Sequence, residues 1–174
     1  MAKYLSHIAI GENEYVETLG VEFDDVQPGL VIEHRPGFMF SWVEARYRAA
    51  LAGDHAPVLM DPVVAAYAGG GQAAISQSWL VGAFAATTTR AFGRVVANLA
   101  WENVVFENPI RDGDMVFAES RILDKRESKS RPDQGVLHIA TRGVARGGHE
   151  VCRYDRKLLV YRSAQGPHKA AGYV

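Results

Sequence analysis

The chain has 174 residues, of which 48% are hydrophobic and 22% charged, and its formal net charge is −1. A chain of this length can bury one substantial core, so it needs neither disulfides nor a structural metal to fold. Its single cysteine excludes an internal disulfide, and no HxxxH or CxxC spacing signals a zinc site. We therefore expect one domain without a metal or cofactor. The lack of a signal-peptide pattern and of a long apolar run predicts a cytoplasmic protein that does not enter a membrane.

Charge is distributed unevenly along the chain. Residues 1–87 carry 4 basic and 10 acidic side chains, whereas residues 88–174 carry 15 basic and 10 acidic ones, and most of the cations are arginines. The planar guanidinium group suits phosphate, so the basic half favours a phosphate-bearing small molecule, although a solvated arginine-rich surface would give the same count. The acidic half and a sequence pI near 6.6 argue against a nucleic-acid-binding protein.

The first half of the chain alternates strand and helix signals. Residues 31–40 have a strand composition. Ser41 then predicts a helix N-cap, with Glu44 three residues later completing a capping box. Small and apolar residues at helical spacing continue this helix up to Gly53, and a second short helix is expected over residues 62–68.

The helix expected next is the most informative element. Residues 73–92 follow three consecutive glycines and contain no charged side chain before Arg90, so nearly every face of this helix is apolar or small. Such a helix has to be covered by other structure. Beyond it, β-rich segments separated by turn signals predict successive antiparallel strands wrapped around the helix. These strands are expected over residues 95–106, 115–123, 136–142 and 151–162.

The loop before this helix carries a recognisable motif. Residues 52–62, Ala-Gly-Asp-His-Ala-Pro-Val-Leu-Met-Asp-Pro, resemble the Gly-Asp-x-Asn-Pro-Leu-His-x-Asp-Pro hydratase motif of MaoC-like hotdog proteins. Residues 23–29 with 33–35 look like the opening strand of that family. Residues 98–101, 109–114 and 126–133 resemble the sheet half of its mesaconyl-CoA hydratase-like branch. The resemblance implies an α+β hotdog fold over residues 23–163, with residues 1–22 as an N-terminal extension and 164–174 as a C-terminal tail.

This resemblance implies an enzyme of the hydratase or dehydratase type, acting on acyl-CoA or acyl-carrier-protein thioesters as a homodimer or a hotdog heterodimer. In the family, an Asp and a His act together on the water that adds across the double bond next to the thioester carbonyl. Here the motif aspartate is Asp54, but Ala56 stands at the Asn position and Leu59 at the His position. Leucine cannot transfer a proton. The chain is therefore a diverged enzyme, catalysing hydration or another addition, elimination or cyclisation, or it is a catalytically silent subunit that binds an acyl group or stabilises an active partner.

Two interpretations stay open for most candidate site residues. Asp54 is a base or water-orienting group, or it only closes a turn, and His55 is an auxiliary group or an ordinary loop residue. Ser76 caps the central helix or faces a substrate, and Trp79 belongs to the core or to an acyl pocket. The remaining candidates are substrate-binding groups: Gly70, Gly71 and Gln72 as donors to the thioester carbonyl, and Arg126 and Arg131 as phosphate ligands or as parts of a solvated turn.

Overall fold

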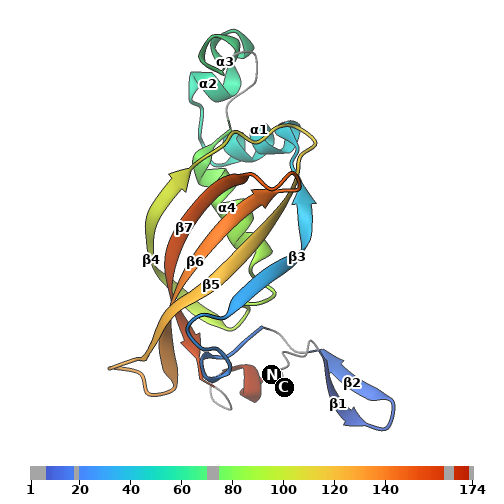
Figure 1. Cartoon of the computed structure of the whole chain (residues 1–174), viewed down its shortest axis with the longest axis vertical. Helices are drawn as coiled ribbons and strands as arrows, with labels where there is room; N and C mark the ends of the chain where they lie inside the picture. Colours follow the sequence, from blue (N-terminus) through green and yellow to red (C-terminus); the bar gives the residue numbers. More distant parts are fainter. Residues whose placement is uncertain (1–6, 18–19, 70–74, 163–166, 173–174) are drawn as a thin grey trace.

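The computed structural model describes residues 7–17, 20–69, 75–162 and 167–172 (Figure 1). The elements in chain order are β1 (His7–Gly11), β2 (Glu14–Glu17), the 3-10 turn η1 (Phe23–Asp25), β3 (Val31–Met39), α1 (Trp42–Leu51), α2 (Pro57–Met60), α3 (Pro62–Gly69), α4 (Gln77–Thr87), β4 (Val95–Phe106), β5 (Met115–Glu127), β6 (Gln134–Ala145), β7 (Glu150–Tyr161) and α5 (Pro167–Ala170). The body is a five-stranded antiparallel sheet curved around α4, which confirms the predicted α+β arrangement. Strands β1 and β2 form a separate hairpin, and α1 to α3 lie beyond the opposite end of the sheet (Figure 1).

The strand order differs from the predicted succession. The order is β3-β5-β6-β7-β4, so β4 pairs with β7 and not with β5, its successor in the chain. Residues 107–114 carry the chain from β4 back to β5, and Phe40 N donates to the carbonyl of Asp114 at their end (2.7 Å). The expectation of strands in simple succession is therefore wrong for β4, because hydrophobic alternation identifies a strand without identifying its neighbour.

The strand boundaries are close to the predicted ones, and the hairpin between β5 and β6 is longer. Strand β4 covers the residues predicted for it, whereas pairing of β5 with β6 continues out to Glu127 and Gly135. Lys125 is part of this extension, and its Nζ donates to the carbonyl of Val26 (2.8 Å). The charged residues 124–127 show no apolar alternation, because they pair with β6 mainly through backbone hydrogen bonds.

Helix α4 is shorter than its sequence predicts. It ends at Thr87, and Thr88 and the residues after it form turns, so the prediction of a helix up to residue 92 is wrong at that end; residues 73 and 74 lie outside the described part of the chain. The hydroxyls of Thr87 and Thr88 donate to the carbonyls of Phe84 and Ala85, at 2.7 Å each. Threonine hydroxyls compete in this way for helix carbonyls, and consecutive β-branched residues are poor helix formers.

The N-terminal half follows the sequence signals with three differences. Helix α1 begins where Ser41 predicts, and the Ser41 hydroxyl accepts from Glu44 N (3.4 Å). The Glu44 carboxylate accepts from Arg48 (2.8 Å) instead of from the Ser41 N–H, so the prediction of a capping box is wrong. The short helix predicted over residues 62–68 is α3, but α2 was not predicted. Phe23–Asp25 form a 3-10 turn that buries the Phe23 ring, so the expectation of an opening strand there is wrong, and β3 begins at Val31.

Two clusters of buried apolar residues lie under the sheet. Leu80 and Phe84 of α4 belong to one cluster, and Phe92, after the helix, belongs to the other. Gly143 on β6 allows the Phe84 ring to lie against the strand backbone, since a Cβ at that position would overlap the ring. One face of α4 is thus fixed against the sheet, whereas Gly82 on another face is exposed in the single chain.

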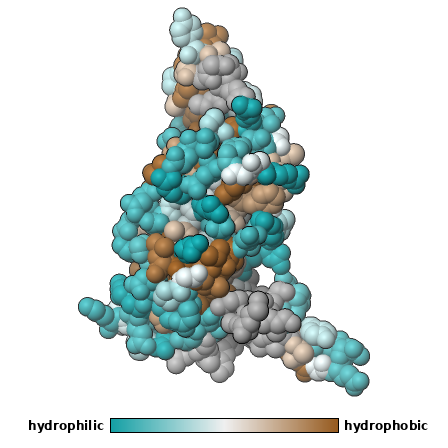
Figure 2. All heavy atoms as spheres, in the orientation of Figure 1, coloured by the Kyte–Doolittle hydropathy of each residue, from teal (hydrophilic) through white to brown (hydrophobic). Residues whose placement is uncertain are grey.

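The surface combines hydrophilic and apolar areas. Figure 2 shows hydrophilic residues over much of the visible face, with a hydrophobic area toward the lower end of the sheet. None of the helices in the described ranges combines the length and apolarity needed to cross a bilayer. Large apolar side chains are exposed on α1 and β4, namely Val43, Tyr47, Leu51, Leu99, Trp101 and Val104.

Candidate active site

Asp54 is held in the loop between α1 and α2. After α1 ends, Gly53 adopts a positive φ of 74°, a conformation that glycine reaches without the steric penalty of a Cβ. This turn brings the Asp54 N–H back to the carbonyl of Ala49 (2.9 Å). The local sequence therefore fixes the motif aspartate directly after a helix end.

The Asp54 carboxylate reaches the first turn of α4. Its Oδ2 accepts a hydrogen bond from Ser76 Oγ at 2.7 Å, and Ser76 is 5% exposed. The Ser76 oxygen also accepts from the backbone N–H of Trp79 (3.4 Å), so Ser76 caps the helix. Ser78 Oγ lies 3.0 Å from Ser76 Oγ. Because the Ser76 hydrogen is used by the carboxylate, Ser78 is the donor in this second contact.

The other motif positions lie nearby and differ in exposure. His55 is exposed, and its backbone N–H donates to the carbonyl of Gly53 (3.1 Å). Leu59, at the position of the family histidine, is 7% exposed in α2. Asp54 is half-buried. The structure thus places a carboxylate and two hydroxyls together, with an apolar side chain at the motif position that would otherwise supply an imidazole.

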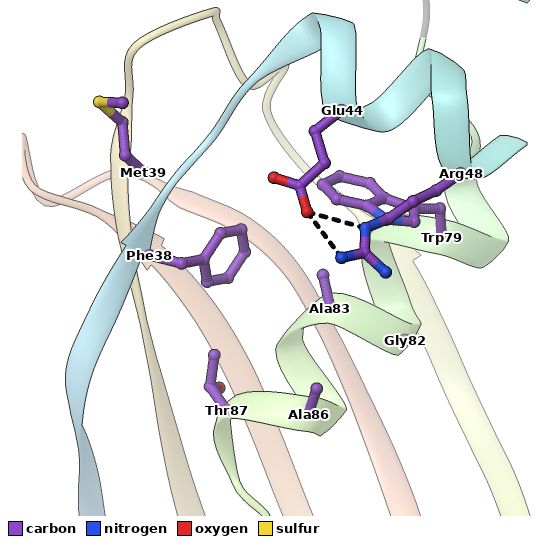
Figure 3. Close-up of a pocket in the computed structure, with 9 residues that line it drawn as sticks. All are labelled: Phe38, Met39, Glu44, Arg48, Trp79, Gly82, Ala83, Ala86 and Thr87. Atoms are coloured by element: carbon purple, nitrogen blue, oxygen red, sulfur yellow. Dashed lines mark hydrogen bonds and ion pairs between the residues drawn. The ribbon is translucent and has the colours of Figure 1, made fainter.

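An apolar groove of about 470 Å³ lies between β3, α1 and α4 (Figure 3). Trp79, Gly82 and Ala83 line it from α4, and the Trp79 ring packs edge-on against Phe40 (centroids 5.5 Å apart). Figure 3 shows the paired Glu44 and Arg48 side chains at its α1 side. Its volume lies within the range of small-molecule sites. Trp79 therefore packs against the core and also forms a wall of this groove. The remaining lining residues are Phe38, Met39, Glu44, Arg48, Ala86 and Thr87.

Arg126 and Arg131 lie far from Asp54 within one chain. Strand β5 starts beside Met39, next to α1, and its 13 residues end at Glu127, a length of about 40 Å for an extended strand. Arg126 is exposed near the far end of β5, and Arg131 in the following turn donates to Gln134 Oε1 (3.4 Å). The structure therefore brings Asp54, Ser76 and Trp79 together. Both arginines lie near the turn between β5 and β6, which Figure 1 shows at the end of the sheet opposite α1.

Three of the predicted substrate-binding residues, Gly70, Gly71 and Gln72, lie outside the described residues. Two features were missed in the sequence: the contact of Ser78 with Ser76, and the groove. A signal for the groove was present, since Ser78, Gly82 and Ala86 recur every four residues and place small side chains on one face of the helix. The apolar composition of this helix instead led to the prediction that other structure covers the helix on all its faces.

A row of buried polar side chains crosses the inner face of the sheet. His34 Nε2 contacts Ser120 Oγ (2.9 Å), and Ser120 Oγ contacts Thr141 Oγ1 (2.9 Å). Burial, together with the nearby Arg156 guanidinium, lowers the pKa of His34 to about 4, so the ring is neutral at physiological pH. Arg156 is 4% exposed and donates to Thr88 Oγ1 (2.9 Å) at the C-terminal end of α4. Thr88 follows Ser76 by twelve residues, about 18 Å along a helix, so this row is separate from the Asp54 site.

Cys152 offers no nucleophile to the site. It is fully buried, and burial raises the pKa of its thiol to about 12. A thiol of this kind is uncharged near neutral pH and therefore unreactive.

Comparison with known proteins gives both the fold and the family. The family model for mesaconyl-CoA hydratase matches residues 9–172. No curated protein matches the chain. Similar solved structures include a MaoC-like dehydratase from Rhodospirillum rubrum, which is 20% identical with a TM-score of 0.73 over 84% of this chain and 100% of that chain. An R-hydratase from Pseudomonas aeruginosa is 17% identical, with a TM-score of 0.66 over 84% of this chain and 89% of that chain.

A third similar structure has a double hotdog fold. This Mycobacterium tuberculosis protein is 22% identical, with a TM-score of 0.71 over 84% of this chain and 46% of that chain. The chain thus corresponds to about half of that protein, which agrees with a single hotdog unit. These likenesses confirm the predicted hotdog fold. Because the family model matches nearly the whole length, the chain belongs to the mesaconyl-CoA hydratase family of MaoC-like proteins.

Proposed function

We propose that the chain is a hydro-lyase that adds water across the double bond next to the carbonyl of an enoyl thioester, or removes water to form that bond. The observation that carries this proposal is the Asp54 carboxylate, which stands at the acid position of the family motif and is bound to Ser76 at the start of α4. An apolar groove follows along the same helix. A related addition, elimination or cyclisation of an unsaturated or β-substituted acyl thioester would use the same groups.

In this proposal the acyl chain occupies the groove, and its thioester end lies beside Asp54. Asp54 accepts a proton from water or orients it, and His55 is an auxiliary group at the exposed side. The enolate-like oxygen that forms on the thioester is stabilised by backbone N–H groups before α4, for which Gly70, Gly71 and Gln72 stay the candidates. The carrier is coenzyme A or acyl carrier protein.

The nucleotide contact we propose requires two copies of the chain. Arg126 lies near the far end of β5 and Arg131 in the turn beyond it, after about 40 Å of extended strand from the end near α1, so we do not expect them to meet a nucleotide whose acyl group lies at Asp54 of the same chain. A homodimer or a hotdog heterodimer would bring these arginines from one subunit toward the site of the other. Strand β4 supports such a pairing, because it is an edge strand with exposed Leu99 and Val104.

The test of this function is mass spectrometry of the purified chain with crotonyl-CoA, trans-2-octenoyl-CoA, mesaconyl-CoA and their 3-hydroxyacyl products, following gain or loss of water. We expect turnover that Asp54→Asn lowers at least about 100-fold, because a general base contributes that much. Asp61→Asn is the matched control, since Asp61 binds the N–H groups at the start of α3 and an amide oxygen can replace it. Turnover that survives Asp54→Asn would remove the carboxylate from the mechanism.

A second candidate function is that of a catalytically silent subunit. It is favoured by one observation, the buried Leu59 at the position of the family histidine. A subunit of that kind would bind the acyl group or stabilise an active partner without catalysis. Isothermal titration with the same thioesters separates the two functions. Binding of trans-2-octenoyl-CoA without any gain or loss of water would favour the silent subunit over the hydro-lyase.

A further inference from the structure

The hydroxyls at the start of α4 form a directed chain that ends at Asp54. Ser76 Oγ donates to Asp54 Oδ2 at 2.7 Å, and Ser78 Oγ donates to Ser76 Oγ at 3.0 Å. The direction is fixed, because Ser76 has one hydrogen and a carboxylate only accepts. A proton taken up by Ser78 therefore has a path through Ser76 to the Asp54 carboxylate.

This chain of hydroxyls leads from the buried Ser76 to the exposed Ser78, one helical turn before the part of α4 that lines the groove. Ser76 is 5% exposed, whereas Ser78 is exposed. Ser78 lies one helical turn before Gly82, which lines the groove, so both residues lie on the same face of α4. Figure 3 shows Gly82 and Ala83 on α4, with the Phe38 and Trp79 rings on either side of the groove. An acyl chain lying along Gly82 would bring its thioester end toward Ser78.

We infer that Ser78 is the proton-transfer residue that contacts the reacting water, replacing the histidine missing at Leu59. This inference rests on the proposed function and names a group of the same site. In hydration, the water oxygen bonds to C3 of the enoyl thioester, and the C2–C3 π electrons move onto the thioester to give an enolate. The water proton passes to Ser78 as the Ser78 proton passes to Ser76 and the Ser76 proton to Asp54.

The second half of the reaction returns this proton. Asp54 gives its proton back to Ser76, Ser76 passes its own to Ser78, and Ser78 protonates C2 of the enolate. One water is added overall, the carboxylate is regenerated, and no oxidant or further reactant is needed. A serine that relays a proton in concert does not have to exist as a free alkoxide, so its high intrinsic pKa is no obstacle.

Steady-state kinetics of the whole chain with crotonyl-CoA and trans-2-octenoyl-CoA test this role. We expect Ser78→Ala to lower kcat at least about 100-fold, with little change in KM, because the relay acts in the chemical step. Ser78→Thr keeps a hydroxyl and should restore most of kcat. Gln77→Ala is the matched control, since Gln77 is the exposed neighbour in the same helical turn. Equal melting temperatures for the variants would exclude loss of folding as the cause.

A solvent isotope experiment adds a readout that packing alone would not change. In mixtures of light and heavy water, kcat of the native chain should depend on the deuterium fraction along a curve, because several protons move together. For Ser78→Ala the residual rate should follow a straight line. Native turnover with unchanged kcat in Ser78→Ala would overturn this inference alone, whereas a native chain that turns over none of the thioesters would overturn the proposed function and this inference with it.

Discussion

His34 makes the stability of the fold depend on acidity. Its pKa is lowered from 6.5 to about 4 by burial and by Arg156, so below pH 6.5 the unfolded chain binds a proton that the folded chain excludes. The free energy of unfolding should therefore be unaffected by this group above about pH 6.5. It should fall by up to about 3 kcal/mol as the pH is lowered toward 4. Urea titrations at pH 7, 5.5 and 4.5 measure this slope.

A pair of histidine variants isolates the contribution of this ring. His34→Gln keeps a polar group opposite Ser120 and cannot be protonated, so its stability should decline less steeply with acid than that of the native chain. His55→Gln is the control, because His55 is exposed and should leave the slope unchanged. Equal slopes for the native chain and His34→Gln would show that other groups cause the acid sensitivity.

Single residues differ in how far the sequence could predict their role. Asp54 could be predicted because the family motif specifies both the residue type and its spacing. Ser41 could be predicted because an N-cap residue binds a backbone N–H only three residues further along the chain. The connection of Ser78 through Ser76 to Asp54 could not be predicted, because Asp54 lies more than twenty residues away in sequence. Arg126 was grouped with the site on charge alone, and charge does not report the length of the strand that carries it.

Helix α4 stabilises the sheet with one face and forms the groove with another. A Cβ added at Gly82 would meet no heavy atom within 4 Å, so Gly82→Ala should raise the free energy of unfolding by about 0.5–1 kcal/mol through helix propensity. The added methyl group would narrow the groove. If the acyl chain lies there, KM for trans-2-octenoyl-CoA should rise about tenfold, as expected for about 1.4 kcal/mol of overpacking, and KM for crotonyl-CoA should rise less.

The two measurements on Gly82→Ala are independent of each other. Thermal unfolding reports the helix, and the ratio of KM values for the long and short thioesters reports the groove. A stabilised variant whose KM values are both unchanged would show that the acyl chain binds elsewhere.

The ends of helices and strands could be predicted only in part. The alternation of residues within β4 predicted both of its ends correctly. The end of α4, in contrast, depends on the hydroxyls of Thr87 and Thr88 and on the burial of Phe92.

At the scale of the whole molecule, β4 is twelve residues long, and no strand of the described residues pairs with its outer edge. Leu99 and Val104 on it are 52% and 42% exposed, and a long edge with exposed apolar residues favours pairing with another strand. We expect light scattering during size exclusion to give about twice the 19.1 kDa mass of one chain. Leu99→Lys should shift this toward a single chain, because a lysine on an edge strand opposes pairing with another strand.

The control for this experiment lies inside the same sheet. Leu123 on β5 is 40% exposed but not on an edge strand, so Leu123→Lys should leave the mass unchanged. A native mass of 19.1 kDa would contradict the pairing of two copies through β4. The sequence could predict the strand but not its place at the edge, because the order β3-β5-β6-β7-β4 arises from long-range pairing.

Strand β6 carries a glycine under each of two aromatic rings. Gly143 lies under Phe84 and Gly135 under Phe23, and a Cβ at either position would overlap the ring above it. Each ring and its glycine therefore fit together only as a matched pair. During divergence from a common ancestor, a larger residue at 143 or 135 could become established only after or together with a smaller one at 84 or 23. These two pairs of positions should accordingly change in concert, while the rest of β6 varies one residue at a time.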